Sequence, residues 1–83
     1  MSPAAQGRRL RALLTAMKWT QVEACLRTGI GKQDMNRYCQ GLRPISAKNT
    51  WRIANATGLT AGYILDGDLR GLTKAQLDWL PDA

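Results

Sequence analysis

The stretch Thr20–Gly41, TQVEACLRTGIGKQDMNRYCQG, decides the fold that this chain of 83 residues is expected to adopt. Its spacing predicts two short helices, over residues 21–28 and 32–40, joined by a tight turn. Their inner faces would carry apolar side chains at helical intervals. These side chains are Cys25, Ile30, Met35 and Tyr38.

The ends of the first of these helices are marked by their own residue types. Thr20 and Glu23 have the Thr-x-x-Glu spacing of a capping box, which favours a helix start. Gly29 supplies the positive φ that a sharp helix exit requires. Gly31 precedes the next helix, where it serves as a tolerable cap.

The second of these helices presents a polar and basic outer face, made of Lys32, Gln33, Asn36, Arg37 and Gln40. A rigidly held helix with such a face fits the major groove of DNA. The stretch therefore predicts a DNA-binding helix-turn-helix. The alternative for this face is an ordinary solvated helix surface, because every surface helix has one.

The remaining chain also has helical spacing. Ser2-Pro3 is a plausible start for a helix that ends near Met17, although Gly7 favours a later start. Its apolar stripe is Leu10, Leu13, Leu14 and Met17. A helix over residues 47–57 follows the cap Ser46, and its expected inward residues are Trp51, Ile53 and Ala54.

Two shorter helices complete an all-α chain. Thr60 caps a fifth helix that contains residues 63–65 and ends at Asp66-Gly67. The spacing Thr73-x-x-Gln76 repeats the capping-box pattern and begins a final short helix. We expect five helices plus this C-terminal one, and no strand.

Charge is distributed unevenly along the chain, whose formal net charge is +6. Residues 1–52 carry ten Lys or Arg against two acidic residues, whereas residues 53–83 carry two against four. A polyanion is the natural partner of the basic part, although charge alone is equally compatible with a merely soluble basic surface. For most of Arg8, Arg9, Arg11 and Lys18, a solvated face is favoured.

Cysteine and histidine usage argues against a metal centre. Cys25 and Cys39 are the two cysteines, and the sequence has no histidine, which excludes the usual zinc ligand sets. We expect no metal and no cofactor, and a reduced, cytoplasmic setting. No apolar run is long enough to span a membrane, and Arg8, Arg9 and Arg11 interrupt the N-terminal region where a signal peptide would lie.

Six motifs follow one another between Gly7 and Gly67: Arg-Leu-Arg-x-Leu, Trp-Thr-Gln-x-Glu-Ala, Thr-Gly-Ile, Met-Asn-Arg-Tyr, Gly-x-Arg-Pro and Arg-Ile-Ala-Asn-Ala-x-Gly. Their order and spacing resemble the Cro and lambda-repressor-like helix-turn-helix family of XRE-type regulators. The resemblance implies a five-helix domain whose third helix lies in the major groove, and a symmetric dimer on an inverted repeat. Thr50 and Thr57 depart from it, because leucines are common there, so the fourth helix is expected to pack less tightly.

The resemblance also implies a set of contact residues. Lys32, Gln33, Asn36 and Arg37 stand where that family contacts bases, with Arg37 also suited to the backbone. Lysine and arginine suit guanine, and the two amides suit adenine or phosphate. Phosphate contacts are expected from Gln21, Gln40, Arg43 and Lys48.

Outside the resemblance lies the tail. We expect a helix-turn-helix domain over residues 1–68 and a tail with a short helix over residues 69–83. The tail carries several apolar side chains: Leu72, Leu77, Trp79 and Leu80. They either cover the small core or form a dimer contact, and dimerisation is slightly favoured.

The sequence thus predicts a sequence-specific transcriptional regulator, a homodimeric repressor bound to a palindromic operator in double-stranded DNA. A bacterial or phage-encoded cytoplasmic protein of this size would fit. The alternative is an antitoxin or anti-activator whose main partner is another protein, held through the tail. No enzyme is expected, because histidine is absent and Asp66-Gly-Asp68 has the pattern of a helix end and turn.

Overall fold

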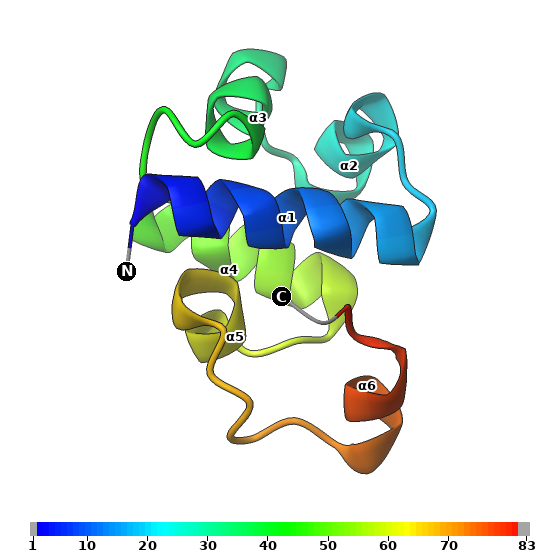
Figure 1. The fold of residues 1–83 in the computed structure, drawn as a ribbon. Helices are drawn as coiled ribbons and strands as arrows, with labels where there is room; N and C mark the ends of the chain where they lie inside the picture. The colour runs from blue at the N-terminus through cyan, green and yellow to red at the C-terminus, as the bar shows by residue number, and fades with distance from the viewer. Residues whose placement is uncertain (1, 82–83) are drawn as a thin grey trace.

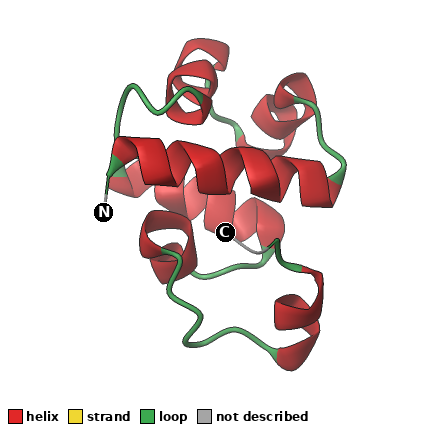
Figure 2. Cartoon of the chain, viewed as in Figure 1, coloured by secondary structure: helices red, strands yellow, loops and turns green. Residues whose placement is uncertain are grey.

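The computed structural model describes residues 2–81. It contains α1 (Pro3–Met17), α2 (Gln21–Thr28), α3 (Lys32–Cys39), α4 (Ala47–Thr57), α5 (Ala61–Asp66) and α6 (Lys74–Trp79) (Figure 1). Figure 2 shows helices and connecting loops, without a strand, over these described residues. The prediction of an all-α fold is confirmed, and α3 ends one residue earlier than expected.

Every described helix except α3 starts after a hydroxyl side chain that accepts a hydrogen bond from the third residue of the helix, which satisfies a backbone N–H that the helix itself leaves free. These residues are Ser2, Thr20, Ser46, Thr60 and Thr73. The expected capping box at Thr20 is half formed, because Glu23 turns to Arg27 at 2.9 Å. The expected capping box of Thr73 and Gln76 is complete, with both of its hydrogen bonds formed.

The core lies between α1 and the helices around it. In Figure 1, α1 crosses in front of α4, with α2 and α3 above it and α5 and α6 below. Of the two short helices of the turn, α3 contributes Met35 and Tyr38 and α2 contributes Ala24. Full burial of a large apolar side chain contributes about 1.5–3 kcal/mol. The buried apolar cluster comprises Leu10, Leu13, Leu14, Ala24, Ile30, Met35, Tyr38, Cys39, Ile45, Ile53, Leu59, Tyr63 and Ile64.

Gly7 does not delay the start of α1, so the expectation of a later start is wrong. The helix begins at Pro3, and Gly7 is buried within it. A Cβ on Gly7 would lie 2.7 Å from the Tyr38 carbonyl oxygen and 2.9 Å from the Gly41 nitrogen. The missing side chain therefore permits α1 to approach the end of α3, a tertiary requirement that helix propensity does not express.

Trp51 does not face the core, contrary to expectation, and its side chain is 62% exposed. Thr50, Ile53 and Ala54 form the buried face of α4 instead, together with Asn49. Because successive helical residues are about 100° apart, Trp51 is turned away from this stripe. Thr50 thus occupies the core-facing position that its apolar neighbour was expected to fill.

A valine at position 50 is expected to stabilise the fold. Thr50 is 1% exposed, and its hydroxyl has no hydrogen-bond partner within residues 2–81. Because an unsatisfied buried hydroxyl is costly and valine has the same shape, Thr50→Val should raise the free energy of unfolding by about 1 kcal/mol. Urea unfolding followed by circular dichroism measures this change.

The matched control is Thr57→Val in the same helix. The Thr57 hydroxyl donates to the Ile53 carbonyl at 2.8 Å and accepts from the Leu59 N–H at 3.3 Å. Its removal should lower the free energy of unfolding by about 1 kcal/mol. Equal shifts of the same sign in both variants would contradict this account of Thr50.

Arg9 and Arg11 of α1 bond to helix ends, although Arg11 is also exposed to solvent. Arg9 donates from Nη1 to the carbonyls of Ile64 and Leu65, at 3.2 and 3.3 Å. Arg11 donates from Nη1 to the Cys39 carbonyl. A cation at a helix C-terminus satisfies free carbonyls and complements the helix dipole. Part of the basic charge therefore stabilises α5 and α3.

Candidate nucleic-acid interface

The turn between α2 and α3 is built by three consecutive residues. Gly29 ends α2 with a φ of 77°, the left-handed conformation that glycine adopts without strain. Ile30 is buried and anchors the turn in the core. Gly31 precedes α3 in an extended conformation and offers no side-chain cap. The predicted helix-turn-helix geometry is present.

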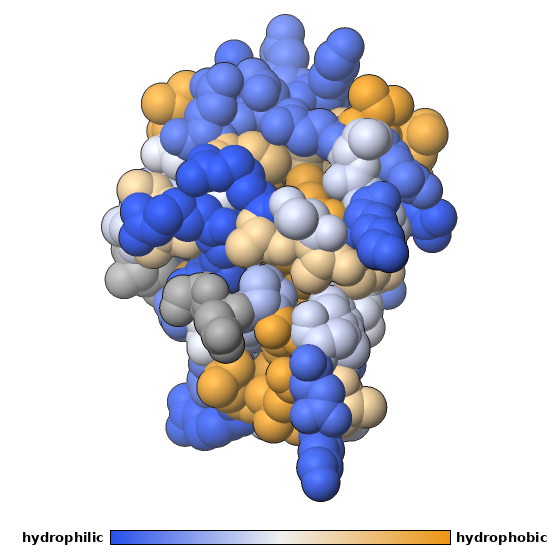
Figure 3. All heavy atoms as spheres, turned by 45° about the vertical axis from the view of Figure 1, so that its right-hand side comes forward, coloured by the Kyte–Doolittle hydropathy of each residue, from blue (hydrophilic) through white to orange (hydrophobic). Residues whose placement is uncertain are grey.

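α3 divides its side chains between the core and the solvent. Met35, Tyr38 and Cys39 are each at most 3% exposed, so the inner side of the helix is fixed by packing. The expected base-contacting residues lie on the other side, where Lys32, Gln33 and Asn36 are exposed and Arg37 is half-buried. Figure 3 shows mainly hydrophilic side chains at the end of the molecule that α2 and α3 occupy.

Two weak contacts join exposed side chains on and beside the outer face of α3. Gln40 donates from Nε2 to Oδ1 of Asn36 at 3.5 Å. Arg43, in the loop after α3, lies with Nη1 3.7 Å from Oδ1 of Asp34. Exposed pairs of this kind contribute about 1 kcal/mol at most. They hold the side chains loosely, and a ligand could displace them.

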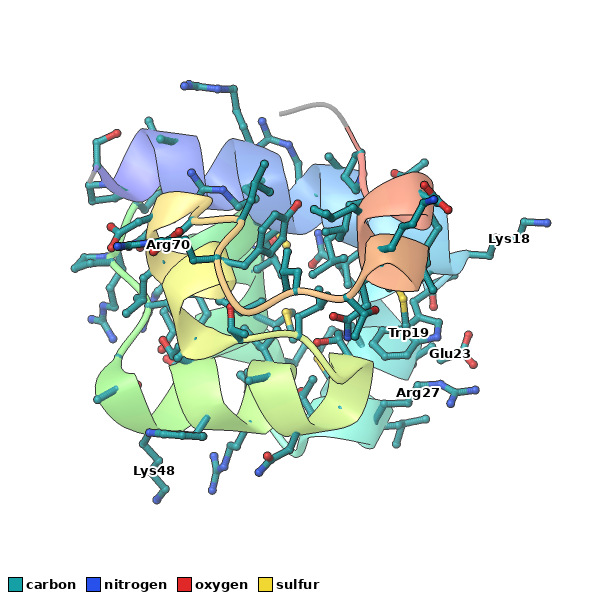
Figure 4. All side chains as sticks on the ribbon, turned by 90° about the horizontal axis from the view of Figure 1, so that it is seen from below. Lys18, Trp19, Glu23, Arg27, Lys48 and Arg70 are labelled. Atoms are coloured by element: carbon teal, nitrogen blue, oxygen red, sulfur yellow. The ribbon has the colours of Figure 1, made fainter. Side chains whose placement is uncertain are left out.

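The expected phosphate contacts flank α3. Gln21 opens α2 and is exposed, as are Gln40 and Arg43 at the exit of α3. Lys48 extends into solvent from the first turn of α4 (Figure 4). All four side chains are exposed, at the start of α2, at the exit of α3 and in the first turn of α4.

Sequence reasoning missed the residues that hold α3 from behind. The Tyr38 hydroxyl accepts from Nδ2 of Asn49 at 2.7 Å, and Arg11 bonds to the Cys39 carbonyl. Asn49 and Arg11 are polar residues of neighbouring helices. A buried tyrosine hydroxyl needs a partner, and this requirement was the one signal in the sequence that pointed to such a network.

The pKa values of Cys39 and Asp68 are shifted by their surroundings. Burial raises the pKa of the Cys39 thiol, which keeps it protonated. Hydrogen bonds from the Arg70 side chain and backbone lower the pKa of Asp68 to about 2. Within residues 2–81, no cluster of three or more His, Cys, Asp or Glu could hold a metal ion.

The tail folds back on the domain with part of its apolar surface. Leu72 and Leu80 pack against the core, and Gln76 donates from Nε2 to the Gly58 carbonyl at 2.7 Å. Leu77 and Trp79 remain 43% and 39% exposed. Figure 3 shows hydrophobic side chains gathered at this end of the molecule, away from α3.

A comparison with known protein families matches residues 10–64 to the helix-turn-helix family, and these residues span the second half of α1, the whole of α2, α3 and α4, and most of α5. The chain belongs to the lambda-repressor-like helix-turn-helix family. It is therefore a DNA-binding transcriptional regulator. Searches of curated proteins and of solved structures gave no match. No helix within residues 2–81 is long and apolar enough to cross a membrane.

Proposed function

We propose that this helix-turn-helix protein recognises a specific DNA sequence by placing α3 in the major groove. The observation that supports this is the division of α3, whose buried residues fix its orientation while Lys32, Gln33 and Asn36 project outward. A helix presented in this way fits the dimensions of the major groove. The function is binding, without a catalytic step or a cofactor.

The chemistry of the face suits particular bases. Lys32 and Arg37 match the two acceptors of guanine, O6 and N7, while Gln33 and Asn36 match adenine N6 and N7. Gln40 donates to Oδ1 of Asn36 at 3.5 Å, and the second lone pair of Oδ1 and the amide hydrogens of Asn36 stay available for adenine N6 and N7. The proposed operator half-site therefore contains guanine and adenine in one strand or across both.

We further propose that two protomers bind an inverted repeat, with the domain of residues 1–68 on DNA and the tail of residues 69–83 between protomers. One small module makes few contacts, and recognition helices about 34 Å apart fit successive major grooves. Of the four tail candidates, Leu77 and Trp79 are exposed and available. Sedimentation with an operator duplex should give two protomers per duplex. One protomer per duplex would contradict the homodimer and favour a different protein partner for the tail.

Repression is the form of regulation we propose, because a dimer bound over a promoter excludes the polymerase without any further activity. A reporter gene behind the operator should be silenced when the protein is expressed. The same reporter should stay active when a variant that no longer binds the operator is expressed instead. Activation of the reporter would overturn the proposed direction of regulation.

The direct test of sequence recognition is selection from a pool of random duplexes, followed by sequencing. The expected product is an inverted repeat with a defined half-site. Recovery of unenriched sequences, with equal affinity for all duplexes, would overturn the proposal and leave nonspecific binding.

Salt dependence provides a prediction for the flanking cations. Each neutralised phosphate contributes a slope of about −0.9 to the logarithm of affinity against that of salt. Arg43→Ala and Lys48→Ala should each make the slope shallower by about 1 per protomer, for all sequences alike. Fluorescence anisotropy across a salt series measures the slope.

The control for these variants is Lys74→Ala, which removes the same charge from the exposed start of α6. Because α6 lies at the end of the molecule away from α3 (Figure 1), the slope should stay within error of the original. A slope that changes as much for Lys74→Ala would show a diffuse charge effect in place of local phosphate contacts.

A further inference from the structure

Asn49 is a buried polar residue in the first turn of α4, with only 7% of its surface exposed. Its side chain makes two hydrogen bonds. Nδ2 donates to the Tyr38 hydroxyl of α3 at 2.7 Å, and Oδ1 accepts from Nη1 of Arg52 at 3.2 Å. Both ends of the amide are therefore engaged inside the fold.

Arg52 carries this connection on to the end of α2. The same Nη1 lies 3.5 Å from the Gly29 carbonyl oxygen, at the exit of α2. A guanidinium there also complements the negative end of the helix dipole. Tyr38, Asn49, Arg52 and Gly29 thus form one chain of contacts that joins α3, α4 and the turn.

The chain of contacts matters because α3 has little other attachment to α4. α3 packs mainly on α1 and α2, and α4 packs on α2 and α5. The Tyr38–Asn49 bond is thus a direct link between α3 and α4. Hydrophobic contacts are non-directional, whereas a short buried hydrogen bond fixes one orientation.

We propose that Asn49 is a positioning residue for DNA recognition, which sets the orientation of α3 relative to the exit of α2 through Tyr38 and Arg52. The proposal rests on the proposed function of α3. Asn49 touches no DNA itself. It acts on the outward residues because side chains that bind a partner must be held within about 0.5 Å of their productive geometry.

Loss of the Asn49 amide should therefore reduce discrimination more than general affinity. Base contacts depend on orientation, whereas phosphate contacts tolerate small movements and carry no sequence information. We expect Asn49→Ala to lower the ratio of affinities for the selected and a scrambled duplex by about tenfold, which is part of the value of one base contact. The salt slope should not change.

The experiment measures the affinity of each variant for the selected duplex and for a scrambled duplex of equal length, at a temperature where all variants are folded. The matched control is Gln6→Ala. Gln6 is also buried, with 2% of its surface exposed, and it bonds to the Ile45 N–H and the Leu65 carbonyl. Gln6→Ala should lower the stability of the fold but keep the ratio of affinities for the selected and scrambled duplexes.

Tyr38→Phe keeps the ring in the core and removes only the hydroxyl, so it carries the test should Asn49→Ala fail to fold. Tyr38→Phe should lower the ratio, because it removes the Tyr38–Asn49 bond. The double variant should lose no more of the ratio than Asn49→Ala alone, because Asn49→Ala already removes that bond together with the bond to Arg52. Unchanged ratios in both variants, or the same loss in Gln6→Ala, would overturn the positioning role. A wild-type protein without discrimination would instead overturn the proposed function itself.

Discussion

Replacement of Lys32, Gln33 and Asn36 together by alanine is expected to abolish discrimination between the selected and scrambled duplexes. Specific DNA binding typically exceeds nonspecific binding by about a thousandfold or more, and base contacts supply about 1–3 kcal/mol each. The variant should lose at least about a thousandfold for the selected duplex and bind both duplexes alike. Fold and stability should persist, because the three residues are exposed and alanine favours helix.

The control for this triple variant removes one lysine and one amide elsewhere. Asn55 and Lys74 are exposed on α4 and α6, so Asn55→Ala with Lys74→Ala changes the net charge by the same amount. Anisotropy titrations at one salt concentration compare the two proteins. A triple variant that still prefers the selected duplex would show that another surface recognises the sequence.

Gly7→Ala is expected to lower the free energy of unfolding by about 2 kcal/mol, within the usual range for overpacking a filled core. In an exposed helix this change stabilises by about 0.5–1 kcal/mol. Here the new Cβ would meet backbone atoms of Tyr38, Cys39 and Gly41 at 2.7–3.1 Å. Backbone cannot rotate away as a side chain can, so α1 and α3 must separate. Thermal and urea unfolding measure the loss.

Gly62→Ala is the matched control, because Gly62 also lies inside a helix. A Cβ there would meet Cβ of Asp68 at 3.6 Å, an ordinary contact. The substitution should leave stability unchanged or raise it by up to about 1 kcal/mol. A stabilising Gly7→Ala would contradict the close approach of α1 to the end of α3.

Helix limits could be predicted from the sequence because local chemistry determines them. Hydroxyl residues such as Ser46 and Thr60 cap helices that end at Gly58 and Gly67, and the structure has these limits. The turn at Gly29 follows from the same rules. Only residues near in sequence take part in such caps, so no knowledge of the tertiary structure was needed.

The side that a helix turns to the core, and the residues that join one helix to another, could be predicted less well, since both depend on residues far apart in sequence. Trp51 was expected inside on its apolar character, whereas the position of Thr50 on α4 decides what is buried. Arg11 bonds to the end of α3, a contact between residues 28 positions apart. Gly7 is required by backbone atoms of another helix. None of these requirements leaves a local pattern.

The outward face of α3 was predictable, because helical spacing alone separates Lys32, Gln33 and Asn36 from the buried Met35 and Tyr38. The support behind that face was not. Asn49 is an unremarked polar residue in the sequence until the fold brings it to the Tyr38 hydroxyl. Contacts with bases, phosphates and a second protomer stay predictions.

The most direct test of the central claim is dimethyl sulfate footprinting of the selected duplex, since this reagent methylates guanine N7 in the major groove and adenine N3 in the minor groove. We expect protection of guanine N7 in two half-sites about one helical turn apart, with adenine N3 still reactive. The triple variant of α3 should leave every guanine reactive. Protection confined to adenine N3, or protection that the triple variant retains, would contradict recognition by α3.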